Sequence, residues 1–242
     1  MSTEFTPIAF MKRYEIKYLI NESQRAYLER ELEGRLFPDR YGETTIASLY
    51  YDTSDFRLIR ASIERPAYKE KLRLRSYGPA SDTSPVFLEM KRKAEGVVYK
   101  RRVQTTVPQA DRFIAGEAGL DASGQISAEI TGFRNYYGSL QPACLIVYDR
   151  IAYYESNGDL RLTMDRNPRY RMDDPVLGES MDGEPLLPEG YSILEVKVQQ
   201  SMPLWLAGVL SRGNIYKSSF SKYGEAYRRE FKNYNYGVRS YV

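Results

Sequence analysis

Four cations stand at alternate positions of one short stretch of the chain: Lys69, Lys71, Arg73 and Arg75. Alternate residues of a β-strand point to opposite faces, so the four cations would share one face and the intervening leucines the other. Two unit charges a few ångströms apart interact by about 4 kcal/mol at an effective dielectric of ~20. Such a face needs water or a polyanion to neutralise it, and these are the side chains that bind phosphate groups.

Several other stretches repeat this pattern of charges that alternate with aliphatic residues. They contain the sets Glu89, Lys91 and Lys93; Arg161, Thr163 and Asp165; Glu195 and Lys197; and the basic run Tyr99-Lys100-Arg101-Arg102. One such strand is typical of a solvent-exposed face, but five in one chain favour a sheet that curls with its charges inward. The interior of a small barrel is normally filled by apolar side chains. A charged interior therefore predicts a tunnel that holds water or a ligand.

The charges of this interior point to one kind of chemistry. About eight to ten cations would face only four or five carboxylates, an excess that calls for an anion with several charges. The carboxylates would pair with lysines or hold Mg²⁺ or Mn²⁺ against phosphate oxygens. Phosphoryl transfer suits this set, because it depends on positioning and charge neutralisation more than on covalent catalysis.

The elements that must position these residues are strands with inserted helices. The patterns predict strands over 13–20, 45–52, 67–77, 86–93, 97–107, 144–155, 159–165 and 191–198. They predict helices over 21–36, 108–118, 126–138, 202–212 and 222–232, the first opened by a capping box of Asn21 and Gln24. Residues 171–190 are expected to form a long acidic loop. Without regular β-α-β alternation, we expect a single α+β domain over 1–242, with 1–11 flexible.

Composition excludes several classes of function. The chain has no histidine, which rules out Ser-His-Asp and Cys-His catalysis and histidine-bound zinc. A single cysteine and the lack of an apolar run of membrane-spanning length predict a cytoplasmic location without direct membrane insertion, and leave a membrane-bound partner open. Nucleic acid is not an expected partner, since the cationic faces of 69–75 and 89–93 contain no aromatic residue for base stacking.

Nearly the whole chain, from Arg13 to about Tyr227, resembles a known family. The motifs in order are Arg13-Tyr-Glu-Ile-Lys17-Tyr, Ser48-Leu-Tyr-Tyr-Asp52-Thr, Lys71-Leu-Arg-Leu-Arg75, Glu89-Met-Lys91, Tyr99-Lys-Arg-Arg102, Tyr148-Asp-Arg150, Arg161-Leu-Thr-Met-Asp165, Leu194-Glu-Val-Lys197 and Phe220-Ser-Lys222-Tyr. Together they resemble the triphosphate tunnel metalloenzymes (CYTH-like), and within them the VTC-type polyphosphate polymerase domain. Arg13 stands where the wider superfamily has a glutamate, which is a feature of the VTC-like branch.

The resemblance implies a fold, a ligand and a set of site residues. The fold would be an antiparallel β-barrel tunnel of about eight strands with flanking helices. The residues implied to grip a triphosphate or polyphosphate are Lys17, Arg73, Arg75, Lys91, Lys100, Arg150, Arg161, Ser221 and Lys222. The cationic strand faces add Lys71, Arg102 and Lys197 to this set. The residues implied to hold Mn²⁺ or Mg²⁺ are Glu195 and, as secondary candidates, Glu15, Glu89 and Asp165.

Three functions remain open at this level. The first is a polymerase that moves the terminal phosphate of ATP to a growing polyphosphate chain, with Arg73, Arg75 and Lys91 neutralising the donor and a metal on Glu195 bridging its oxygens. The second is a hydrolase of tripolyphosphate or nucleoside triphosphates, in which Glu15 or Glu89 orients or deprotonates water. The third is a polyphosphate-binding module without turnover.

Overall fold

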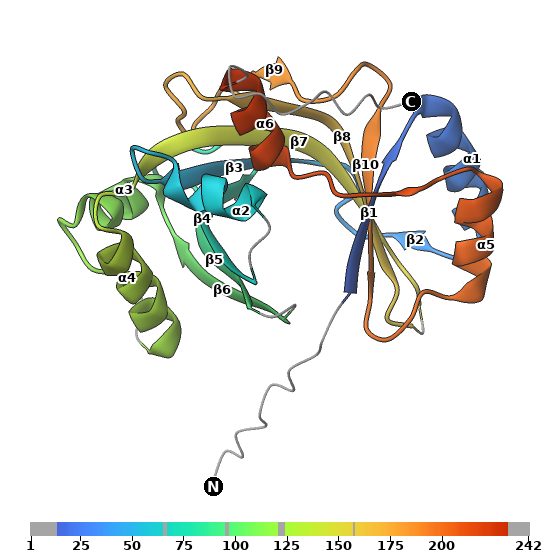
Figure 1. The fold of residues 1–242 in the computed structure, drawn as a ribbon, viewed down its shortest axis with the longest axis horizontal. Coiled ribbons are helices and arrows are strands. Elements are labelled where there is room, and N and C mark those ends of the chain that lie inside the picture. Colours follow the sequence, from blue (N-terminus) through green and yellow to red (C-terminus); the bar gives the residue numbers. More distant parts are fainter. Residues whose placement is uncertain (1–13, 65–66, 95–96, 121–123, 157, 232–242) are drawn as a thin grey trace, which may run out of the picture.

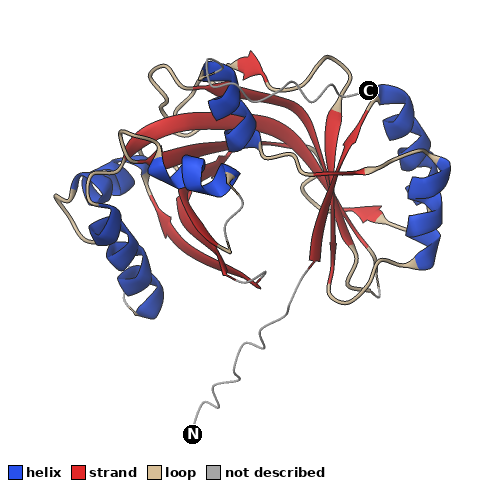
Figure 2. Cartoon of the chain, in the orientation of Figure 1, coloured by secondary structure: helices blue, strands red, loops and turns tan. Residues whose placement is uncertain are grey.

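The computed structural model describes residues 14–64, 67–94, 97–120, 124–156 and 158–231, so the lead-in 1–11 lies outside the described part. Within that part the chain forms one large antiparallel sheet with six helices (Figure 2). The strands are β1 (Tyr14–Ile20), β2 (Phe37–Pro38), β3 (Thr44–Asp52), β4 (Tyr68–Tyr77), β5 (Val86–Ala94), β6 (Val97–Thr105), β7 (Gln141–Tyr154), β8 (Arg161–Arg171), β9 (Glu184–Pro185), β10 (Ser192–Val198) and β11 (Lys217–Ser218). The helices are α1 (Glu22–Leu32), α2 (Arg57–Ile63), α3 (Val107–Ala115), α4 (Gln125–Tyr137), α5 (Leu204–Arg212) and α6 (Lys222–Glu230).

The sheet is an open arch. Its strand order is β11-β1-β10-β8-β7-β3-β4-β5-β6, with β2 added to β7 and β9 to β8. Figure 1 shows the long strands β7 and β8 across the top, with β6 and β1 on opposite arms. The predicted closed barrel of about eight strands is not seen, because no ladder of the described residues joins β6 to β11 or β1. The α+β class is confirmed.

The convex face of the arch carries the apolar residues that alternate with the charges. Leu72 and Leu88 pack with Phe113 and Phe133 under α3 and α4, outside one arm (Figure 1). Leu162 and Leu194 pack with residues of α1 and α5 outside the other arm. This explains why charged residues alternate with aliphatic ones in the sequence. The helices cover the aliphatic residues on the outside and leave the charged side chains on the concave face.

Helices α2 and α6 cover part of the concave face. Tyr223 and Ala226 of α6 pack with Ile59 of α2 on apolar residues of the central strands. Asp52, at the end of β3, fastens both helices, because its carboxylate accepts from the backbone amides of Leu58 and Ile59 and from the Tyr223 hydroxyl. The polar part of the concave face therefore ends against α6.

Most predicted elements are present. The short strands β2 and β11 were not predicted, and three further differences occur. Helix α1 begins with the predicted capping box, but it ends at Leu32, just before Gly34 takes up a left-handed φ of 73°. Helix α2 was not predicted. Strand β8 runs on to Arg171, and the expected loop over 171–190 contains the short strand β9, which pairs with it. No helix in the described ranges is long and apolar enough to cross a membrane.

Candidate functional site

A buried carboxylate, Glu89 on β5, lies among four cations on the concave face. Arg73 donates from Nε to its Oε2 at 2.9 Å, and Lys100 Nζ lies 2.9 Å from its Oε1. Arg75 and Arg102 approach it to 3.7 and 3.4 Å. Burial raises the pKa of Glu89, but the charges of Arg73 and Arg75 outweigh it and bring this pKa down to about 2. One carboxylate thus serves four cations, which leaves most of their charge uncompensated.

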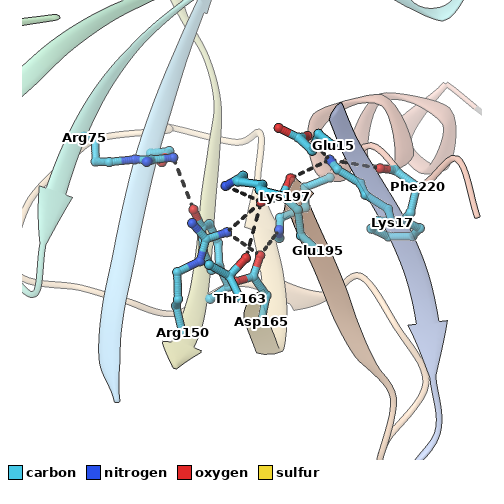
Figure 3. Close-up of polar contacts among 12 residues, drawn as sticks. Glu15, Lys17, Arg75, Arg150, Thr163, Asp165, Glu195, Lys197 and Phe220 are labelled. Carbon is cyan, nitrogen blue, oxygen red and sulfur yellow. Dashed lines mark hydrogen bonds and ion pairs between the residues drawn. The ribbon is translucent and has the colours of Figure 1, made fainter. Parts of the chain in front are cut away.

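A second carboxylate group lies on the other arm of the arch (Figure 3). Glu195 of β10 has Lys197 Nζ at 2.9 Å, Lys17 Nζ at 3.6 Å and Arg150 Nη2 at 3.8 Å. Lys17 also lies 3.6 Å from Glu15 on β1, so it stands between two carboxylates. Although burial raises the pKa of Glu195, a hydrogen bond with Glu15 and the charge of Lys197 keep this pKa well below its usual range.

Asp165 of β8 connects this group to helix α6. Arg150 of β7 binds its two oxygens through Nε at 2.6 Å and Nη2 at 2.8 Å, a bidentate pair. Lys222, the first residue of α6, donates to the same carboxylate and lies over the Tyr148 ring at 4.2 Å. Burial raises the pKa of Asp165, but Lys222 and Arg150 lower it to about 2. The start of α6 is therefore anchored in the charged site.

Two tyrosines that were not predicted as site residues hold the central arginines. Arg73 Nη1 donates to the Tyr50 hydroxyl at 3.1 Å, and Arg75 Nη2 donates to the Tyr148 hydroxyl at 3.2 Å. The Tyr50 ring also stacks on Tyr223 of α6, with ring centroids 4.8 Å apart. The alternation of the motif Ser48-Leu-Tyr-Tyr-Asp52 could have placed Tyr50 on the polar face, because it is two residues from Ser48.

Lys71 and Tyr50 have unusual acidities for their types. Burial and the charges of Lys17 and Lys91 lower the pKa of Lys71 to about 8. Burial raises the pKa of Tyr50, but Arg73 and Lys71 outweigh it and lower this pKa to about 8. Neighbouring cations contribute to both shifts, whereas burial adds to the shift of Lys71 and opposes that of Tyr50.

Side chains also cross between the arms of the arch. Lys91 Nζ on β5 lies 3.6 Å from Glu15 Oε2 on β1, although the two strands share no ladder. Lys71 Nζ donates to Ser221 Oγ, the N-cap of α6, at 3.4 Å. The concave face is therefore narrow enough for long side chains to span it.

The family model of the VTC domain matches residues 12–231. The chain belongs to the VTC domain family. A candidate adenylate cyclase from Bacillus halodurans has a similar structure at 14% sequence identity, with 87% of this chain and 96% of that chain covered and a TM-score of 0.52. Another candidate adenylate cyclase, from Vibrio parahaemolyticus, has 10% sequence identity and a TM-score of 0.47, with 90% of this chain and 98% of that chain covered. A search of curated protein sequences gives no significant match.

The predicted site residues of this VTC domain lie together on the concave face or at the start of α6. Eleven of them are cations and four are carboxylates, so these residues together carry a net charge of +7. Arg161 is exposed at the end of β8, opposite Lys197 in the ladder. Their roles in binding and catalysis stay predictions.

The predicted metal ligands of the VTC domain form one pair rather than a complete cage. Glu15 and Glu195 each lie 3.6 Å from Lys17 Nζ, which stands between them, whereas Glu89 and Asp165 are each held by arginine and lysine. In the described ranges no three acidic or cysteine side chains gather closely enough to ligate a metal ion. Mg²⁺ is commonly bound through one or two carboxylates together with substrate phosphates. The pair of glutamates would suit such an ion only if water and substrate supplied the remaining ligands.

Proposed function

We propose that this VTC domain is a metal-dependent polyphosphate polymerase that transfers the terminal phosphate of ATP to a growing polyphosphate chain. The observation that carries the proposal is the charge of the predicted site residues on the concave face, which comprise eleven cations and four carboxylates. Several of these cations are largely buried, so water alone neutralises them poorly. A chain of phosphates supplies the negative charge that such a surface lacks.

The residues divide into a donor group and a metal group. Arg73 and Arg75, held in place by tyrosines, would neutralise the donor phosphates together with Lys91. Glu195 and Glu15 would hold Mn²⁺ or Mg²⁺, which supplies positive charge to the phosphate oxygens. Arginines fixed before substrate arrives stabilise the charge of the transferring group without rearrangement.

The attacking group needs little help in this reaction. A terminal phosphate of polyphosphate is already ionised at neutral pH, so no general base is required, which suits a site without histidine. Lys222 and Ser221, at the start of α6, lie where an acceptor chain on the concave face would meet the helix. We assign them to the acceptor, while the arginines of β4 serve the donor.

The test is a product assay with ATP and Mn²⁺ or Mg²⁺. We expect long-chain polyphosphate on a gel, and its loss in the double variant Arg73→Ala/Arg75→Ala. The matched control is Arg60→Ala/Arg101→Ala, which removes the same charge from exposed Arg60 and from Arg101, paired with Glu129. Full activity and full tripolyphosphate affinity in the concave-face variant would contradict the proposal.

The same assay separates the alternatives. Phosphate release without chain growth would favour hydrolysis, for which the partly exposed carboxylate of Glu15 is the candidate to orient water. Polyphosphate binding without turnover, unchanged in Glu195→Ala, would favour a binding module. Cyclic AMP is measured as well, because the structures with a similar fold include candidate adenylate cyclases.

A further inference from the structure

A cavity lies outside the charged face, between helices α2 and α4. It has a volume of about 560 Å³, within the range of small-molecule sites. The start of β4 and residue Arg92 of β5 form its floor. None of its charged groups belongs to the site described above, and nothing in the proposed polymerase reaction uses it.

The walls of this cavity are rich in tyrosine. Tyr136 of α4 is 69% exposed and Tyr68 of β4 is 52% exposed, although both are large aromatic residues. The Tyr136 ring stands perpendicular to the Tyr137 ring, with centroids 5.0 Å apart. Exposed aromatic faces beside a cavity are platforms on which a nucleobase or other flat ring stacks.

A cation without an acidic partner stands at the same wall. The Arg57 guanidinium lies over the Tyr136 and Tyr137 rings, at 5.6 and 5.3 Å from their centroids. In the described ranges no carboxylate comes within 4.0 Å of it. The rings orient the guanidinium but do not neutralise it, so it can donate hydrogen bonds to the oxygens of a phosphate group.

The floor of the cavity is polar and fixed. Glu70 is 5% exposed, and it accepts from the Tyr137 hydroxyl at 2.9 Å and from Arg92. The Tyr68 hydroxyl also hydrogen-bonds to this carboxylate, so three protein groups hold it in place.

A glycine leaves open space on the side of the cavity that helix α4 forms. Gly132 lies inside α4, where glycine weakens a helix, and it lines the cavity. A Cβ added there would meet nothing within 4 Å, so packing within the protein does not require the glycine. Its presence leaves space for a ligand to approach the helix backbone.

We propose that this cavity binds a nucleoside phosphate, with the base on the tyrosines and the phosphate on Arg57. The inference is independent of the proposed polymerase activity. It joins three observations at one place: exposed rings, an unneutralised guanidinium and a wall kept open by glycine.

The experiment is a calorimetric titration with AMP in the Arg73→Ala/Arg75→Ala background, which weakens binding at the concave face. We expect saturable binding that falls by at least about tenfold in Arg57→Ala, and also in Gly132→Leu, which fills the cavity. Arg60→Ala is the matched control, because Arg60 lies on the same helix, pairs with Asp55 and does not line the cavity. Its affinity for AMP should be unchanged.

Adenosine and inorganic phosphate are titrated as competitors. Competition by both supports recognition of base and phosphate together. Competition by phosphate alone would overturn the nucleoside assignment. Equal AMP affinity in Gly132→Leu, or no saturable binding at millimolar AMP, would overturn the site itself. Thermal unfolding of each variant without ligand identifies any loss that comes from misfolding.

Discussion

Glu89 shows how a single buried residue organises the concave face. Four cations converge on its carboxylate, and its pKa is lowered to about 2 because they favour the ionised form. Its stabilising contribution is present above its ordinary pKa of 4.5 and is lost as the pH falls through about 2. The residue keeps the arginines ordered before any ligand binds.

Glu89→Gln should therefore destabilise the free protein. Removing the charge leaves four neighbouring cations without a counterion, and we expect a loss of about 3 kcal/mol in urea unfolding. Tripolyphosphate should restore part of this loss, because it binds the folded state and supplies negative charge. The control Glu129→Gln removes a partner of Arg101 and should cost less than about 1 kcal/mol. Equal effects of the two substitutions would contradict the role given to Glu89.

Lys71 and Tyr50 predict a pH dependence of phosphate binding. Both groups have a pKa of about 8, so a rise in pH through 8 removes the positive charge of Lys71 and adds a negative charge at Tyr50. Both changes oppose a polyanion, and tripolyphosphate affinity should fall about tenfold between pH 7 and pH 9. Because a bound polyanion raises both pKa values, binding near pH 8.5 should take up protons.

The measurement is calorimetry in buffers of different ionisation enthalpy. Tyr50→Phe should reduce the proton uptake while it keeps the ring that stacks on Tyr223. Proton release at pH 8.5, or an affinity independent of pH in the wild-type protein, would contradict the prediction.

At the scale of elements, the glycines of helices α4 and α6 differ in the space that surrounds them. An added Cβ at Gly132 of α4 would meet nothing within 4 Å, whereas one at Gly224 of α6 would lie 3.2 Å from Ser221 Oγ, the N-cap side chain. Gly132→Ala should stabilise the protein by about 0.8–1 kcal/mol, the usual gain in a helix interior. Gly224→Ala should gain less or lose stability, since Ser221 must shift. Thermal unfolding measures both, and equal gains would contradict the crowding at Ser221.

The sequence predicts which side chains share a face of a strand better than it predicts whether the sheet closes into a barrel. Inverted alternation identifies the charged face of β4, β5, β8 and β10, because the period of a strand fixes which side chains share a face. Helix α2 was not predicted because its N-terminus lacks the usual sequence signal. Its N-cap residue, Phe56, makes no side-chain hydrogen bond, and Asp52, farther upstream, accepts from amides of the first turn instead. Whether two edge strands meet depends on curvature of the whole sheet, which no local pattern encodes.

At the scale of the whole molecule, the charge is strongly uneven. The chain carries +3 in total and the predicted site carries +7, so the remaining residues carry a net charge of −4. A field of this shape directs anions to the concave face and away from the rest of the surface. Binding of polyphosphate should consequently weaken as ionic strength rises.

The open arch predicts a structural response to polyphosphate. Lys91 and Lys71 already cross the concave face, and a bound polyanion would draw the cations of both arms inward. We expect slower amide exchange along β6, the edge strand of one arm, when polyphosphate binds. Hydrogen exchange with mass spectrometry measures it, with Arg73→Ala/Arg75→Ala as the control. Protection of β6 that persists in this variant would contradict the response.

The unpaired edges of the sheet also determine how a long polymer could enter. A closed ring admits a polymer only by threading one of its ends. In the described part of the chain the two arms share no ladder, so a polymer could enter sideways, at any point along its length, where the contacts of Lys91 and Lys71 across the concave face open. The protein would then engage chains whose ends are occupied by other molecules, and its rate of loading would not fall as free ends become scarce.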